Sequence, residues 1–146
     1  MNRTHMHRRA QCLLPATIET SGLLHFGTAP GQVEGSLLAS LFGQGAQGLV
    51  VLRLASSTAL AVQRQGLAFF AQARMARAGL LRRCLPVRYA CWTRMQLQKE
   101  QMRPVVGAED KEMDWSGAAY VAAVEGRRAW LAVLPVERLV VYGWGE

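Results

Sequence analysis

The chain has 146 residues, of which 51% are hydrophobic and 18% are charged, and this composition predicts a folded protein with a packed core. It excludes an intrinsically disordered chain, which would carry fewer apolar and more charged residues. The net charge of +7 indicates an acidic partner, such as a nucleic acid or an acidic protein.

The first half of the chain predicts a flexible start, two strand regions and a short helix. Residues 1–11 are basic and are expected to form a flexible N-terminus. Residues 12–26 indicate a strand pair or one bent strand. Closely spaced leucines followed by glycines predict a helix over about 33–42, and the apolar run at 48–55 predicts a strand.

Residues 58–79 allow two interpretations. The whole stretch can form one helix that ends at Gly79, or residues 58–64 can form a strand followed by a helix that begins after Gly66. The apolar spacing favours a helix at least over 66–78. The residues of its expected apolar face are Val62, Phe69, Ala73, Ala76 and Leu80.

The last part of the chain predicts strands. Residues 87–98 alternate between the two faces of a strand, a polar loop follows, and a hairpin is expected to turn near Glu125 and Gly126. Its core candidates are Tyr120, Val124, Trp130 and Val133. With a final strand after Pro135, the pattern predicts an α+β protein. We expect one domain over 12–146, with a mostly antiparallel sheet of about five to six strands and two helices.

The positive charge is unevenly distributed along the chain. Residues 1–98 hold eleven arginines and two acidic residues, whereas residues 99–146 hold six basic and eight acidic residues. No acidic residue lies between Glu34 and Glu100. Codon usage explains most of the preference for arginine over lysine, but it explains the missing acids less well. A block of like charges repels itself unless it meets an anion, which favours an anionic partner.

A candidate nucleic-acid interface follows from this block and one tryptophan. In a regular strand, Arg88, Trp92 and Arg94 project from the same face. Trp92 could stack on an unpaired base while arginines contact phosphates. The alternatives are a cation–π contact within the protein or burial of Trp92 against a helix. The predicted interface residues are Arg74, Arg77, Arg82, Arg83, Arg88, Trp92 and Arg94.

Other residue clusters carry weaker chemical signals. The acidic residues over 109–114 lack the spacing of a calcium loop, and His5, His7 and Cys12 lack a fourth zinc ligand. We therefore expect no bound metal and no cofactor. Because no nucleophile motif is present either, we expect no catalysis. The sequence favours a protein that binds single-stranded or structured DNA or RNA. The alternative is a small structural or adaptor subunit of a larger complex, possibly a nucleoprotein, that contacts an acidic protein.

The cysteine content and the apolar runs bear on localisation. Three cysteines are too few for a disulfide framework and fit a reducing compartment. No run reaches the roughly 20 apolar residues of a membrane span. Near the N-terminus the apolar stretch is broken by Pro15 and Glu19, whereas a secretory signal has an uninterrupted apolar stretch. We therefore expect a cytoplasmic protein that does not bind membranes.

Overall fold

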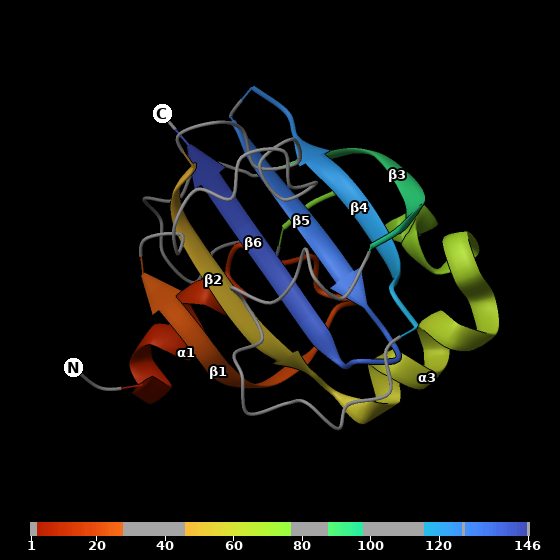
Figure 1. Cartoon of the computed structure of the whole chain (residues 1–146), viewed down its shortest axis with the longest axis horizontal. Coiled ribbons are helices and arrows are strands. Elements are labelled where there is room, and N and C mark those ends of the chain that lie inside the picture. Colours follow the sequence, from red (N-terminus) through yellow and green to blue (C-terminus); the bar gives the residue numbers. More distant parts are fainter. Residues whose placement is uncertain (1–2, 28–45, 77–87, 98–115, 127, 146) are drawn as a thin grey trace.

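The computed structural model describes residues 3–27, 46–76, 88–97, 116–126 and 128–145. The elements in chain order are α1 (Arg3–Gln11), β1 (Thr20–Gly27), β2 (Ala46–Leu54), α3 (Ser56–Gln65), the 3-10 helix η1 (Gly66–Gln72), β3 (Tyr89–Gln96), β4 (Ala118–Val124), β5 (Ala129–Leu134) and β6 (Leu139–Gly145). The six strands form one antiparallel sheet in the order β1-β2-β6-β5-β4-β3 (Figure 1). This architecture confirms the predicted α+β fold.

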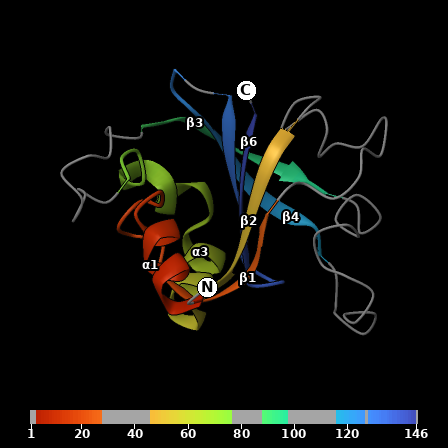
Figure 2. The ribbon, with the colours of Figure 1, turned by 90° about the vertical axis from the view of Figure 1, so that its left-hand side faces the viewer.

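The described helices all lie on one side of the sheet (Figure 2). Strands β3 to β6 form a meander, and β6 then pairs with β2. Because α3 and η1 follow β2 in the chain and η1 contacts β3, this stretch crosses the helical face to the far edge of the sheet. Helix α1 packs against β1 at the opposite edge. The surface formed by η1 and β3 therefore lies at the opposite edge of the sheet from the contact between α1 and β1.

The hydrophobic core lies between the sheet and the helices. Alternating residues of the central strands are buried there, among them Leu52, Leu131 and Val140. The other face of the sheet is also apolar, and Val51 and Val141 are fully buried on it. Burial on both faces explains why β2 is a continuous apolar run without alternation between apolar and polar residues.

The N-terminal residues form a helix that contacts the sheet, which differs from the flexible start expected over 1–11. Ala10 of α1 is buried. His7 Nε2 lies 2.8 Å from Thr20 Oγ1 in β1, and Gln11 Nε2 donates a hydrogen bond to the same oxygen at 3.1 Å. These contacts join residues distant in sequence, so a composition-based prediction could not include them.

The stretch after β2 is helical, but it is not one continuous α-helix. Helix α3 covers 56–65, so the alternative of a strand over 58–64 is wrong. Gly66 ends α3 with a φ of 59°, in the left-handed region that favours glycine. The short 3-10 helix η1 follows, in place of the helix predicted over 66–78.

The other predicted elements agree with the structure to different degrees. Strand β1 covers 20–27, so only the second half of the strand region predicted over 12–26 forms a strand. The helix predicted over 33–42 lies outside the described residues. The β4–β5 hairpin turns at Glu125 and Gly126 as predicted. Of its core candidates, Trp130 alone is only half-buried. Across the described ranges, no helix has the length and apolar character needed to cross a membrane.

Glu137 is a buried carboxylate in the turn between β5 and β6. Its Oε1 accepts hydrogen bonds from the backbone N–H groups of Ser116 at 2.7 Å and Gly117 at 3.2 Å. Its Oε2 is buried and has no hydrogen-bond partner among the described residues. The carboxylate therefore ties this turn to the chain just before β4.

We expect Glu137→Ala to lower the free energy of unfolding by about 2–3 kcal/mol, because two backbone donors lose their acceptor. Glu137→Gln is the matched control, since it keeps an acceptor oxygen and should cost less than half as much. Urea denaturation measures both values. Equal losses would show that these hydrogen bonds do not stabilise the turn.

Candidate nucleic-acid interface

A β-bulge in β3 changes which of its side chains face the helices. Ala90 pairs with Ala123, but Thr93 pairs with Val121, so three steps along β3 match two steps along β4. Cys91 lies within this bulge and has a φ of 41°. Bulges commonly place one residue in this left-handed conformation, and that residue is usually glycine.

The extra residue brings Trp92 to the helical side of the sheet. Tyr89, before the bulge, and Trp92, after it, both pack against the core beneath η1. In an unbroken strand they would lie on opposite faces. Arg94 lies on the side of Trp92, opposite Tyr120, whereas Arg88 precedes Tyr89 and lies on the other side. The prediction that all three interface residues of this strand share one face is therefore wrong for Arg88.

Trp92 is wedged between β3 and the helices. Its ring stacks on Phe70 of η1, with centroids 4.3 Å apart and an interplanar angle of 27°. Its Nε1 donates a hydrogen bond to the carbonyl oxygen of Ala73 at 2.8 Å. The side chain is half-buried. Since one ring face and the indole N–H are already used within the fold, Trp92 is not a freely exposed stacking platform.

The segment that follows η1 runs beside the start of β3. The carbonyl of Arg74 accepts the backbone N–H of Tyr89 at 2.7 Å, and Met75 forms a β-bridge with Arg88. The Tyr89 hydroxyl donates a hydrogen bond to the carbonyl of Leu13. Burial raises the pKa of Tyr89 far above its ordinary value, so this hydroxyl remains protonated and keeps its donor role.

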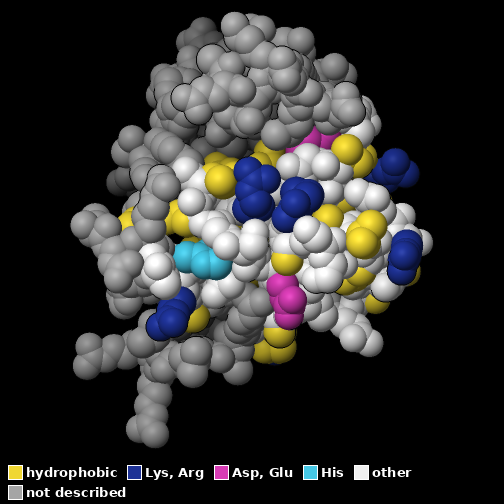
Figure 3. Space-filling view, turned by 90° about the horizontal axis from the view of Figure 1, so that it is seen from below, with side chains coloured by type: hydrophobic (Ala, Val, Ile, Leu, Met, Phe, Trp, Pro, Cys, Tyr) yellow, Lys and Arg dark blue, Asp and Glu magenta, His cyan; other side chains and the backbone are white. Residues whose placement is uncertain are grey.

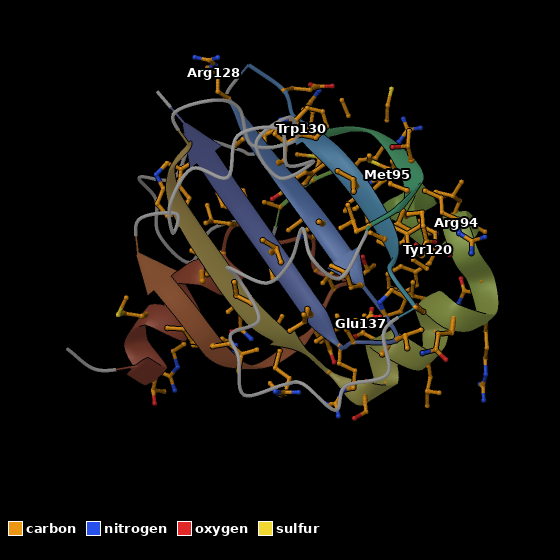
Figure 4. The ribbon with its side chains drawn as sticks, in the orientation of Figure 1. Arg94, Met95, Tyr120, Arg128, Trp130 and Glu137 are labelled. Carbon is orange, nitrogen blue, oxygen red and sulfur yellow. The ribbon has the colours of Figure 1, made fainter. Side chains whose placement is uncertain are left out.

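An open pocket of about 240 Å³ lies between η1, this segment and β3. Its lining consists of Leu67, Phe70, Ala71, Arg74, Tyr89, Cys91 and Trp92. The pocket thus brings together two of the predicted interface residues, Arg74 and Trp92. Arg94 lies two residues beyond Trp92 on the same side of β3, at the sheet edge beside the helices (Figure 4).

The remaining predicted interface residues, Arg77, Arg82 and Arg83, lie outside the described residues, as does the acidic cluster over 109–114. The other arginines with described side chains are spread over different elements: Arg8, Arg53, Arg64, Arg128 and Arg138. Figure 3 shows two adjacent basic side chains on the face seen from below, with the others separated from them by neutral and apolar groups. The described arginines therefore do not form one continuous patch.

Five residues of the pocket lining were not identified from the sequence: Leu67, Phe70, Ala71, Tyr89 and Cys91. The helical spacing indicated Phe69, but the tighter turns of a 3-10 helix bury Phe70 instead. The adjacent pair Phe69 and Phe70 was the only hint in the sequence that an aromatic side chain is buried here. No local signal marks the bulge, because its left-handed residue is a cysteine and not a glycine.

Neither a metal site nor a similar protein of known function helps to assign a function to this surface. Within the described part of the chain, no group of three His, Cys, Asp or Glu side chains lies close enough to hold a metal ion. No protein-family model matches the chain, and neither curated proteins nor solved structures give a significant match. The functional argument therefore depends on the geometry of the η1–β3 surface.

We expect Trp92→Ala to lower the free energy of unfolding by about 3 kcal/mol, because it removes the ring packed on Phe70. Trp92→Phe keeps a ring but loses the indole donor, and should cost about 1 kcal/mol. Arg94→Ala is the control on the same side of the strand and should change stability by less than about 0.5 kcal/mol. Chemical denaturation that shows no loss for Trp92→Ala would mean that the ring is not part of the core.

Substitutions at Cys91 test the bulge itself. In a regular strand, valine is more stable than glycine. In the left-handed conformation of Cys91 the order should reverse, because a β-branched side chain is strained there and glycine is not. We expect Cys91→Gly to be at least about 1 kcal/mol more stable than Cys91→Val in thermal or urea unfolding. If Cys91→Val were more stable than Cys91→Gly, as in a regular strand, the result would contradict the bulge.

Proposed function

We propose that this protein binds single-stranded or structured nucleic acid along the surface formed by η1 and β3. The observation that supports this proposal most strongly is the pocket in which Arg74 lies together with aromatic side chains. Arg74 and Arg94 are both exposed, and a guanidinium group is well suited to contact phosphate. In this proposal the two arginines contact the phosphates of one strand that passes over the pocket.

The charge of the surrounding sequence supports an anionic partner. Arg74 and Arg94 both come from the stretch between Glu34 and Glu100, which contains no acidic residue. Arg88 is not included among the proposed contacts. It lies on the other side of β3, and its carbonyl accepts the backbone N–H of Glu125 at 2.9 Å, which brings an acidic residue close to it.

The proposed role is binding without chemical conversion, in a reducing compartment such as the cytoplasm. Cys12 and Cys91 are both free thiols, which persist in reducing compartments. Contacts to phosphates and to a base face do not depend on base identity, so we expect weak sequence preference.

A structural or adaptor subunit that contacts an acidic protein is the second candidate. It is favoured by three exposed apolar side chains on α3, on η1 and after it: Leu60, Leu67 and Met75. Exposed apolar groups of this kind are typical of a surface that a protein partner covers. If the protein is such an adaptor, we expect it not to bind oligonucleotides, even at low salt.

Salt dependence tests nucleic-acid binding through these two arginines. Each phosphate contact with a single strand contributes a slope of about −0.7 to a plot of log affinity against log salt. Two contacts should therefore weaken the binding of a labelled oligonucleotide about sevenfold between about 50 and 200 mM salt. Fluorescence anisotropy measures this change.

Arg74→Ala and Arg94→Ala should each reduce that slope by about 0.7. Arg8→Ala is the charge-matched control, because Arg8 is exposed on α1, which packs at the other edge of the sheet. Absence of binding at about 50 mM salt would contradict the proposal. An equal effect of Arg8→Ala would instead show non-specific attraction to the whole molecule.

A further inference from the structure

The pocket beside Trp92 is small and combines aromatic side chains with one guanidinium group. Its volume of about 240 Å³ is below the range of about 300–1,000 Å³ typical of pockets for drug-sized ligands. Tyr89 and Trp92 both line it, with ring centroids 6.0 Å apart and an interplanar angle of 36°. Leu67 and Ala71 add apolar surface on the side of η1.

The protein holds Trp92 in place on its own. Phe70 packs against the ring, and the indole N–H is hydrogen-bonded to Ala73. A side chain that is already fixed loses little conformational freedom when a ligand binds. The part of Trp92 that lines the pocket is therefore a preformed surface for a planar ligand.

We propose that this pocket accepts one unpaired nucleobase of a single strand, an inference that rests on the proposed function. The base would pack against Trp92, and its own phosphate would lie next to Arg74. Arg74 is exposed and also lines the pocket. A nucleotide supplies both a flat ring for the aromatic side of the pocket and a negative charge for this guanidinium.

The pocket should therefore distinguish single strands from duplexes. A base within a duplex is stacked and paired, and it cannot enter a pocket unless it is first extruded, which costs free energy. A strand with phosphates but no bases should keep the contacts to the arginines and lose the contact to the pocket.

Two labelled strands of equal length, oligothymidylate and an abasic strand, separate these contributions in fluorescence anisotropy at low salt. We expect oligothymidylate to bind about 5- to 150-fold more tightly than the abasic strand. Ala71→Leu, which adds bulk at the pocket lining, should remove most of this difference. Ala68→Leu is the matched control, since Ala68 is also exposed on η1 but is outside the lining, and it should leave the difference unchanged.

The outcomes distinguish the pocket from the wider proposal. If both strands bind equally, the base pocket is overturned while phosphate binding by the arginines stands. If Ala71→Leu and Ala68→Leu reduce the difference equally, the base does not bind at the pocket. If neither strand binds, the proposed function fails and the base pocket fails with it. Circular dichroism confirms that both variants are folded.

Discussion

One extra residue in β3 determines which of its side chains contact the helices. The bulge between Ala90 and Thr93 places Trp92 on the same side as Tyr89, beneath η1. Arg94 follows on this side and Arg88 does not. Cys91 within the bulge has a positive φ, which is uncommon for a residue with a side chain. Without the bulge, Trp92 would lie on the opposite face of the sheet, and the pocket would lose one of its walls.

The position of η1 depends on the same contacts as the pocket. A short 3-10 helix has poor hydrogen-bond geometry of its own, and within the described part of the chain no side chain caps η1. The stacking of Phe70 on Trp92 and the hydrogen bond from Trp92 to Ala73 join η1 and the segment after it to β3. Stability and the shape of the candidate site are therefore coupled at Trp92. Substitutions of exposed lining residues, such as Ala71, separate the two effects better than substitutions of the tryptophan itself.

The sequence was sufficient for the elements that local patterns determine. The apolar run of β2 and the turn at Glu125 and Gly126 both gave correct predictions. Contacts between separate elements carry no such local pattern. Helix α1 contacts β1 through hydrogen bonds between the side chains of His7 and Gln11 and that of Thr20, and the bulge is visible only in the pairing of β3 with β4. Of the candidate site, the sequence identified Arg74, Trp92 and Arg94, but not the direction in which Trp92 points.

Cross-strand nuclear Overhauser effects between β3 and β4 test the bulge most directly, because they report the register and the side of Trp92 together. The structure predicts contacts between Thr93 and Val121 and between the Trp92 indole protons and the Phe70 ring. A strand without the extra residue would place Trp92 opposite Val121 and its indole away from Phe70. That second pattern would contradict the placement of Trp92, and with it the proposed pocket.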